Sequence, residues 1–202
     1  MSVNKFDVII IGAGAAGMMC AIEAGKRGRK VILLDHAKKI GEKIRISGGG
    51  RCNFTNIYSN PKKFISLNPS FIISALNQYT HQNFIDLINK HRIKFHEKKL
   101  GQLFCDENSQ QIIDMLKHEC LQANVTLKND TSIDSIDRLD FFNIKTKNIN
   151  YESESLVIAT GGLSVPKIGA SKFGYEVAKK FGINIVDTQP ALVPLTFNEN
   201  IL

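Results

Sequence analysis

Three glycines near the start of the chain have the spacing of a turn that binds a dinucleotide. Gly12, Gly14 and Gly17 form the pattern G-x-G-x-x-G, in which Ala15 and Ala16 occupy the last two variable positions. The first glycine permits a tight turn, the second lets the backbone approach a pyrophosphate, and the third allows a helix to pack closely on a strand. The N-terminus of that helix offers free N–H groups and a partial positive charge to the anion.

Asp35 lies 23 residues beyond Gly12, where a second strand is predicted to end. A carboxylate at this position accepts hydrogen bonds from ribose hydroxyls and repels a 2′-phosphate. The alternative is an aspartate that only forms a turn before His36. Because the glycines and Asp35 have the required separation, we predict a site for a dinucleotide without a 2′-phosphate, which argues against NADP.

The most unusual string, SGGGRCNFTN, occupies residues 47–56. Gly48, Gly49 and Gly50 carry no side chains, so their N–H groups can surround phosphate oxygens, and Arg51 can add a bidentate contact. By composition alone, a flexible loop is the alternative. Cys52 can be read as a lone reactive thiol beside Arg51, but structural burial of this cysteine is the favoured interpretation.

The elements that must position these residues follow from the apolar pattern. Residues 6–11 (FDVIII) are typical of a buried parallel strand, residues 15–27 have helical spacing, and residues 30–35 (KVILLD) predict a second strand. Strand, helix and strand within about 30 residues make a βαβ unit with parallel strands. The glycine- and asparagine-rich segment from His36 to Pro61 is predicted to be a loop.

Further elements complete the predicted fold. Helices are predicted over residues 69–79, 81–90, 109–123 and 175–181, and strands near Phe95 and over residues 103–105, 155–160 and 183–186. Short alternating segments at residues 125–128, 133–136 and 141–147 predict a small antiparallel β-meander. The predicted fold class is therefore α/β, a Rossmann-like domain with a parallel central sheet plus this meander.

The composition excludes several other classes of protein. The 202 residues are 43% hydrophobic, which excludes disorder, and no recurring period indicates a repeat array. The uncharged run from Val8 to Ile22 is too short to cross a membrane, and its glycines argue against a signal peptide. Four widely spaced cysteines match neither a disulfide scaffold nor a zinc site. We therefore expect a cytoplasmic protein with no metal site and no membrane contact.

The net charge of +7 (pI ≈ 9.2) is concentrated between Lys26 and Arg51, where nine basic residues accompany two acidic ones. Such a cluster attracts the phosphates of a nucleic acid or of a nucleotide cofactor. A solvated basic face without a partner is the alternative, and it is favoured for residues 26–30 at the end of a helix.

Several strings resemble one family, the bacterial aminoacetone-oxidase-type FAD-binding flavoproteins. They comprise Lys43, the string at residues 47–56, and LVIATGGLS at residues 156–164 followed by Pro166. PALVPL at residues 190–195 resembles the same family, so the resemblance extends from residue 6 to residue 195. These are two-dinucleotide-binding-domain flavoproteins with the glutathione-reductase type of fold. The chain departs from them at Phe173, where the family tends to have an acidic residue.

The resemblance implies FAD as the cofactor and assigns residues to its parts. The pyrophosphate is expected at the glycine turn and the adenosine ribose at Asp35, and Ile133 is expected to meet the adenine through its backbone. The residues implied along the flavin side of the cofactor are Lys43, Gly49, Gly50 and Arg51. The residues implied to close a strand over the nucleotide are Thr160, Gly161 and Gly162. Pyrophosphate contacts are implied for Gly12, Gly14, Ala15, Ala16 and Gly17.

Members of this family are longer than the present chain and add a substrate-side domain and a segment that returns to the flavin. We therefore expect residues 1–190 to form an incomplete FAD-binding domain and residues 191–202 to begin a connection to a second domain. The expected function is an FAD-dependent oxidoreductase acting on a small-molecule substrate or NAD(P)H, with no catalytic side chain assigned because the flavin carries the redox chemistry.

Two alternatives to this function remain open. One is a truncated, non-catalytic nucleotide-binding remnant. The other is a nucleic-acid-associated flavoprotein, which the pI suggests. The nucleic-acid alternative ranks lowest, because the basic excess coincides with the expected cofactor loops and no basic patch interleaved with aromatic residues is recognised.

Overall fold

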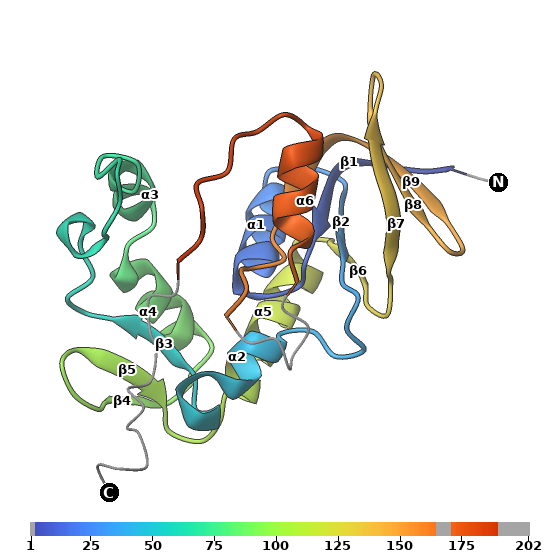
Figure 1. Ribbon diagram of the computed structural model, residues 1–202. Helices are drawn as coiled ribbons and strands as arrows, with labels where there is room; N and C mark the ends of the chain where they lie inside the picture. Colours follow the sequence, from blue (N-terminus) through green and yellow to red (C-terminus); the bar gives the residue numbers. More distant parts are fainter. Residues whose placement is uncertain (1–2, 165–170, 190–202) are drawn as a thin grey trace, which may run out of the picture.

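The computed structural model describes residues 3–164 and 171–189. Its largest element is a six-stranded sheet with the strand order β6-β2-β1-β9-β8-β7 (Figure 1). The strands β6, β2, β1 and β9 run parallel, whereas β8 and β7 extend the sheet in antiparallel fashion. Their bounds are β1 Val3–Ile11, β2 Val31–Leu34, β6 Thr126–Lys128, β7 Ile133–Arg138, β8 Phe142–Thr146 and β9 Asn150–Ile158.

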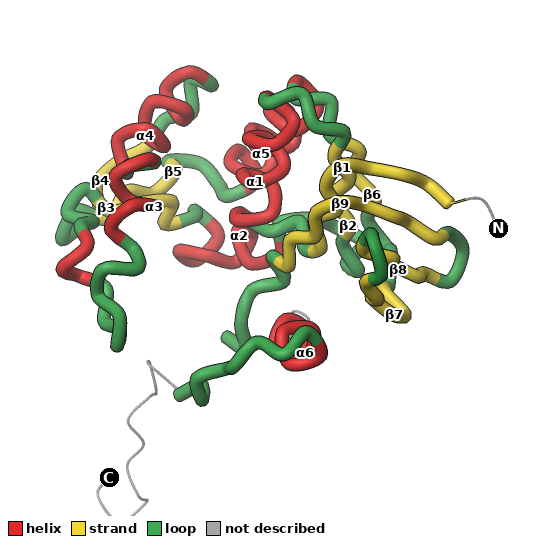
Figure 2. Tube along the Cα trace, turned by 90° about the horizontal axis from the view of Figure 1, so that it is seen from above, coloured by secondary structure: helices red, strands yellow, loops and turns green. Residues whose placement is uncertain are grey.

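Helices cover both faces of this sheet. Figure 2 shows α1 (Ala15–Lys26) and α5 (Gln110–Gln122) on one side of it and α6 (Phe173–Lys180) on the other. Side chains that alternate along a strand point to opposite faces, so Ile10 packs with α1 and α5 while Ile9 packs in the core beneath α6. Burial on both faces explains why β1 and β2 read as continuous apolar runs.

A smaller lobe, residues 53–105, lies beside the sheet (Figures 1 and 2). Its antiparallel sheet has the order β3-β5-β4, and α3 and α4 accompany it. The ring of Phe54 packs against those of Phe84 and Phe95, with centroids 6.0 and 5.5 Å away. The elements of the lobe are β3 Asn53–Asn56, the 3₁₀ helix η2 Pro61–Lys63, α3 Ile73–Gln78, α4 His81–Lys90, β4 Phe95–Glu97 and β5 Gln102–Cys105.

A buried carboxylate joins this lobe to the helices of the main sheet. Glu119 of α5, whose side chain is 3% exposed, contacts Lys26 Nζ of α1 at 3.1 Å, Lys90 Nζ at 2.7 Å and His91 Nε2 at 2.8 Å. Burial opposes ionisation of this carboxyl, but the hydrogen bonds from Lys90, His91 and Lys26 outweigh it and lower its pKa to about 2. The charged form therefore stabilises the packing of α4 on α1 and α5.

The fold class is as predicted, an α/β Rossmann-like domain with an antiparallel extension. The helix predicted over residues 81–90 has those bounds and begins with Thr80, which forms a capping box with Asn83. One segment of the predicted meander is placed differently: β6 pairs in parallel with β2 rather than with β7 or β8. A three-residue alternation carries too little information to identify its partner strand.

Two further predictions were wrong in part. The segment from His36 to Pro61 is not a loop throughout, because it forms α2 (Glu42–Ile46), the 3₁₀ helix η1 (Ser47–Gly50) and β3. The glycines that suggested a loop adopt left-handed backbone conformations inside an ordered turn. Residues 183–186 form no strand with any described residue, and Ile183 is 60% exposed. A strand requires a hydrogen-bonded neighbour as well as an apolar pattern.

Some predictions fall outside the described residues. These are Pro166, which belongs to the string that resembles the family, and the segment from residue 190 onward, which includes PALVPL. Among the described residues, no helix is both long enough and apolar enough to cross a membrane.

Candidate functional site

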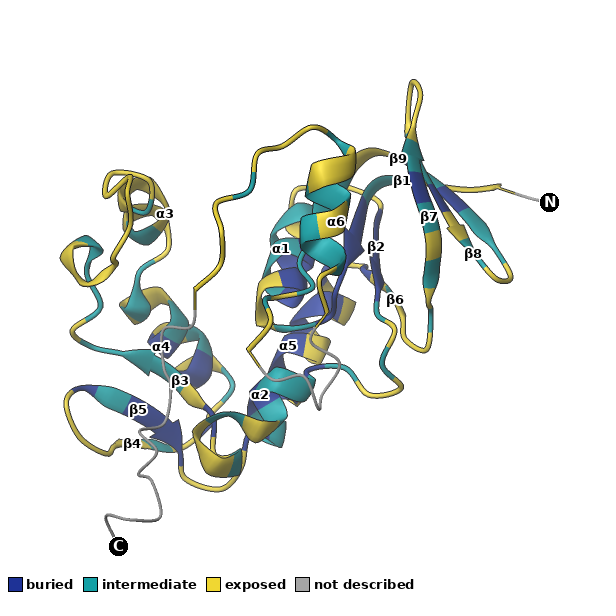
Figure 3. Cartoon of the chain, in the orientation of Figure 1, coloured by how far each residue is buried: buried dark blue, intermediate teal, exposed yellow. Residues whose placement is uncertain are grey.

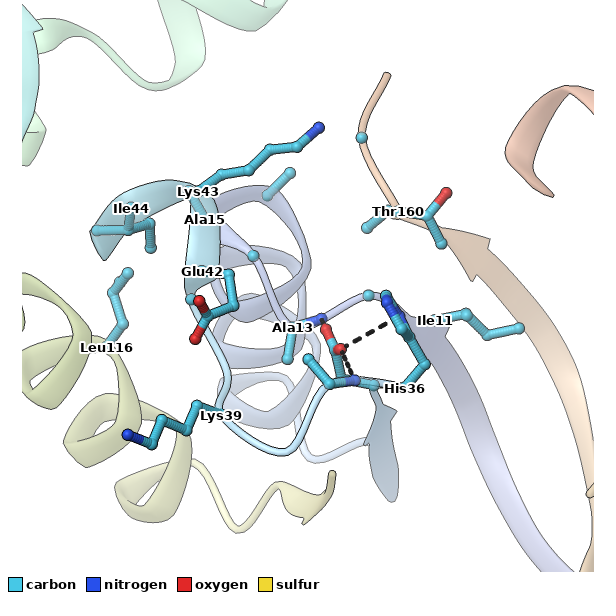
Figure 4. A pocket seen from close by; sticks show the side chains of 18 of the residues that line it. Ile11, Ala13, Ala15, His36, Lys39, Glu42, Lys43, Ile44, Leu116 and Thr160 are labelled. Atoms are coloured by element: carbon cyan, nitrogen blue, oxygen red, sulfur yellow. Dashed lines mark hydrogen bonds and ion pairs between the residues drawn. The ribbon is translucent and has the colours of Figure 1, made fainter. Parts of the chain in front are cut away.

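A cavity of about 610 Å³ lies where β1, β2 and β9 end, between the glycine turn, α2 and the smaller lobe. The carboxyl ends of parallel strands are the usual place for a ligand in an open α/β sheet. Figure 4 shows part of its lining, including Ala13, His36, Lys43 and Thr160. The predicted site residues in its wall are Gly12, Gly14, Ala15, Ala16, Asp35, Lys43, Ile133, Thr160 and Gly161.

The three glycines of the turn are required for different reasons. A Cβ at Gly12 would lie 2.5 Å from the carbonyl oxygen of Ala159, and one at Gly17 would lie 1.8 Å from that of Gly12. These two glycines therefore allow the close packing of β1, α1 and β9. A Cβ at Gly14 meets no atom of residues 3–164 and 171–189 within 4 Å, so Gly14 borders the cavity.

The N-terminus of α1 faces this open space. Gly14 is its N-cap, and no side chain of the described residues caps it. The first N–H groups of a helix have no partner inside the helix, and the helix dipole adds a partial positive charge there. This arrangement fits a pyrophosphate, which needs donors and space but no side chain.

Asp35 fastens the end of β2 to the glycine turn. Its Oδ2 accepts a hydrogen bond from Ala13 N at 2.6 Å, and its Oδ1 accepts one from Ala37 N at 2.8 Å. His36 Nδ1 lies 3.5 Å from Oδ1, and the Asp35 side chain is 13% exposed (Figure 4). The carboxylate thus lines the cavity and also orders the turn, a structural role that the sequence did not reveal.

Lys43 joins α2 to the segment that follows β9. Its Nζ donates a hydrogen bond to the carbonyl of Gly162 at 2.8 Å (Figure 4 shows Lys43 and Thr160). Gly161 has φ +73°, and a Cβ there would lie 2.9 Å from this Nζ. The side-chain oxygen of Thr160 is buried and has no hydrogen-bond partner among the described residues. An orphaned oxygen in the cavity wall fits a polar ligand.

The string at residues 47–56 forms an ordered turn that leads into β3. Gly50 O accepts a hydrogen bond from Ser109 N at 2.7 Å, and Arg51 O accepts one from Cys105 N at 3.0 Å. These bonds fix the string to β5 and to the start of α5. Ser47 and Cys52 reach the cavity wall, whereas Gly49, Gly50 and Arg51 do not, nor do Gly17 and Gly162.

One end of the cavity is apolar. Its apolar residues are Met19, Ile44, Phe54, Phe84, Ile112 and Leu116. They were not predicted as site residues, because their spacing matches that of core positions in helices and strands. An apolar wall excludes water and suits a planar ring system. Only the folded chain brings α1, α2, β3, α4 and α5 together here.

Cys52 lies in the cavity wall but is only 5% exposed. Burial raises the pKa of its thiol, and the hydrogen bond with Ser47 lowers it by less. Burial likewise raises the pKa of the nearby Cys105 thiol to about 12. Both thiols are therefore protonated near neutral pH, which agrees with the structural interpretation of Cys52. No cluster of three His, Cys, Asp or Glu side chains suited to a metal occurs within residues 3–164 and 171–189.

A glycine turn at a helix N-terminus, a carboxylate at the end of β2 and a cavity above both define a dinucleotide-binding Rossmann domain. The chain belongs to the family described as "HI0933-like protein Rossmann domain", whose model matches residues 6–192. Its cofactor is FAD, as predicted.

Curated relatives extend this result. A protein of Escherichia coli (strain K12) named "Ribosomal RNA dihydrouridine synthase" is 52% identical over 200 residues, which cover 98% of this chain and 50% of the relative. A protein of the same name from Haemophilus influenzae is 44% identical over 196 residues, covering 95% of this chain and 49% of the relative. The chain thus spans about half the length of the curated relatives it matches. The name of these two relatives is not aminoacetone oxidase. The resemblance predicted from the sequence therefore holds at the level of FAD-binding Rossmann flavoproteins.

More distant proteins share the fold. The "3-dehydro-bile acid delta(4,6)-reductase" of Clostridium scindens is 24% identical over 190 residues, covering 92% of this chain and 46% of the relative. Among solved structures, a 3-ketosteroid-delta4-(5alpha)-dehydrogenase from Rhodococcus jostii has a TM-score of 0.54 at 14% identity, covering 79% of this chain and 46% of its own. Thermovibrio ammonificans THI4 has a TM-score of 0.54 at 12% identity, and the match covers 89% of this chain and 64% of THI4.

Proposed function

We propose that this chain provides the FAD-binding part of a flavin-dependent reductase that converts a uridine of ribosomal RNA to dihydrouridine. The observation that carries the proposal is the 52% identity, over 98% of the chain, to the E. coli relative of that name. The cavity supports it, because its two ends suit the two halves of FAD. This ordering reverses the ranking of functions from sequence, in which a small-molecule substrate came first.

The proposed reaction adds two hydrogens across the C5–C6 double bond of the uracil ring. Bound FAD, reduced at the expense of NAD(P)H, would supply one of these hydrogens as a hydride, and the other would enter as a proton from water. The chain's own residues then have supporting roles: the N–H groups after Gly14 hold the pyrophosphate, Asp35 accepts from the adenosine ribose, and Phe54 and Phe84 exclude water from the ring system. Lys43 keeps α2 and Gly162 at a fixed separation around the cofactor.

A small-molecule reductase is the second candidate. The observation that favours it is the C. scindens relative, which is named as a bile-acid reductase and aligns with 92% of this chain. The identity of 24% is less than half of that to the E. coli protein. The two candidates share the cofactor site and differ in the substrate.

Disruption of the gene in its source organism tests the proposal on the whole protein. Ribosomal RNA is isolated from the parent and the disrupted strain, and dihydrouridine is mapped by nucleoside mass spectrometry. We expect one or more dihydrouridines to disappear and to return when the gene is restored on a plasmid. Unchanged dihydrouridine in the disrupted strain would refute the proposed substrate and favour the small-molecule candidate.

A further inference from the structure

Four exposed lysines and an exposed tyrosine belong to the smaller lobe. We name this group, Tyr58, Lys62, Lys63, Lys98 and Lys99, the Tyr58 surface. Tyr58 is 60% exposed, and all four lysines are exposed. Figure 3 shows the surrounding part of the lobe, including α3, as largely exposed. The site described above does not use these residues, and none of them lines the cavity.

The tyrosine is held firmly although it is exposed. A Cβ at Gly101, where φ is +76°, would lie 2.6 Å from Cδ2 of Tyr58, so the ring rests directly on this glycine. Tyr58 N donates to Asn56 Oδ1 at 2.8 Å, and Asn56 Nδ2 donates to the Leu100 carbonyl at 2.9 Å. The backbone bond from Ile57 N to Gly101 O, at 2.9 Å, completes the attachment. The ring is therefore preorganised with one side available to a ligand.

The contact at Gly101 attaches the segment that leads to Lys62 and Lys63 to the turn that carries Lys98 and Lys99. Lys98 and Lys99 occupy the turn between β4 and β5, in which Gly101 N donates to Glu97 Oε1 at 2.9 Å. Lys62 and Lys63 end the short helix η2, which Asn60 caps by accepting from Lys62 N. None of the four lysines forms an ion pair with a described residue.

We propose that the Tyr58 surface binds a single-stranded segment of RNA, with a base stacked on Tyr58 and phosphates held by the lysines. The inference rests on the proposed function and names the contact surface for its substrate. Aromatic rings that accept an unpaired base, flanked by cations, are the general means of binding single strands. Residues 57–101 contain seven Lys or Arg against two Asp or Glu, which complements a phosphate backbone.

Strand β3 connects the Tyr58 surface to the cavity. Strand β3 carries Asn53 and Phe54, which line the cavity, and ends at Asn56, two residues before Tyr58. A base that is to be reduced must leave its stack to reach a flavin. A strand bound at Tyr58 would therefore lie close enough for a neighbouring nucleotide to be extruded toward the apolar end.

Fluorescence anisotropy with the FAD-loaded full chain tests the surface without requiring turnover. The probe is a fluorescein-labelled oligouridylate, compared with a duplex RNA of the same length. We expect Tyr58→Ala to weaken binding of the single strand about tenfold, because one stacked base is lost, whereas Tyr58→Phe keeps the ring and the affinity. Lys98→Ala with Lys99→Ala should reduce the slope of log K against log salt by about 1.4, the value for two single-strand phosphates.

A matched control uses two exposed lysines at the opposite end of the molecule. Lys145→Ala with Lys147→Ala, on and after β8, removes the same charge and should leave the salt slope and the affinity as in the parent. The FAD absorbance and circular dichroism of every variant show whether the fold is retained. Vesicles of phosphatidylserine and phosphatidylcholine test the other polyanion that lysines attract.

Each outcome has a definite meaning. Parent-like RNA affinity in both Tyr58→Ala and the Lys98/Lys99 variant would overturn the surface while leaving the proposed function intact. A parent protein that binds FAD but no RNA would overturn both proposals. Tighter binding to the vesicles than to RNA, lost in the same variants, would assign the surface to an anionic membrane and overturn the inference.

Discussion

Replacement of Asp35 by alanine separates its two roles. The substitution removes the acceptors for Ala13 N and Ala37 N, at 2.6 and 2.8 Å. Ala13 is 1% exposed, so its N–H would be left buried without a partner. An unsatisfied buried donor costs about 1–3 kcal/mol, and we expect the free energy of unfolding to fall by about 2 kcal/mol.

The same substitution should also weaken FAD binding. Loss of a charged acceptor for the ribose hydroxyls costs about 1–3 kcal/mol, or about 5- to 150-fold in Kd. The assays are urea unfolding of the apoprotein and titration with FAD followed by flavin fluorescence. Because the turn is also loosened, the measured loss of affinity includes some reordering of residues 12–14.

Asp7 provides a matched control for Asp35. Its Oδ2 accepts from Lys30 N at 2.7 Å, joining the same two strands at their opposite end, and it is half-buried and does not line the cavity. Asp7→Ala should therefore lose less than about 1 kcal/mol of stability and bind FAD like the parent. Normal stability and normal FAD affinity in Asp35→Ala would refute both roles. Reduced stability with normal FAD affinity would refute the ribose contact alone.

Three further predictions concern other parts of the site and the fold. Lys43→Met should weaken FAD binding about tenfold, because it removes the hydrogen bond to Gly162. Lys39 also lies in the cavity wall, and Lys39→Met should change the FAD affinity less than about twofold. Equal losses of affinity in the two variants would contradict the role of Lys43. The pKa of Glu119 is lowered from 4.5 to about 2. Its contribution to the free energy of unfolding, about 3 kcal/mol, is therefore present above pH 4.5 and lost as the pH falls toward 2. Glu119→Gln should flatten this pH dependence of stability in urea unfolding, and an unchanged pH profile would argue against the role of Glu119. The 202-residue chain spans about half the length of its curated relatives. Assayed alone, it should oxidise NAD(P)H slowly, because a site open to water loses positioning of the reactants. Robust turnover with stoichiometric FAD would contradict this.

The sequence predicted the parts of the site that are local in the chain. The glycine turn and its helix depend on neighbouring residues, and the 23-residue spacing to Asp35 follows from one βαβ unit. For the same reason the helix over residues 81–90 was predicted with its bounds. These features require no knowledge of which distant segments meet.

Features that depend on distant contacts were not predictable from local pattern. Lys43 meets Gly162 across 119 residues, and Tyr58 rests on Gly101, a residue of another segment of the smaller lobe. β6 was assigned to the wrong partner because a short strand takes its direction from the sheet that accepts it. The surface lysines and Tyr58 form a basic aromatic patch only after folding, which explains why a nucleic-acid role ranked low from sequence.

The central claim is that this FAD cavity serves the modification of ribosomal RNA, and a single allele tests it most directly. Gly14→Val places a side chain in the space at the N-terminus of α1, where the new Cβ meets no atom within 4 Å in the part of the chain that the structure describes. The fold should persist while the pyrophosphate is excluded. With the allele in the chromosome and the protein level checked by immunoblot, the account predicts loss of FAD from the purified protein and loss of a dihydrouridine from the ribosomal RNA. Parent-like dihydrouridine in cells whose Gly14→Val protein carries no FAD would contradict the account.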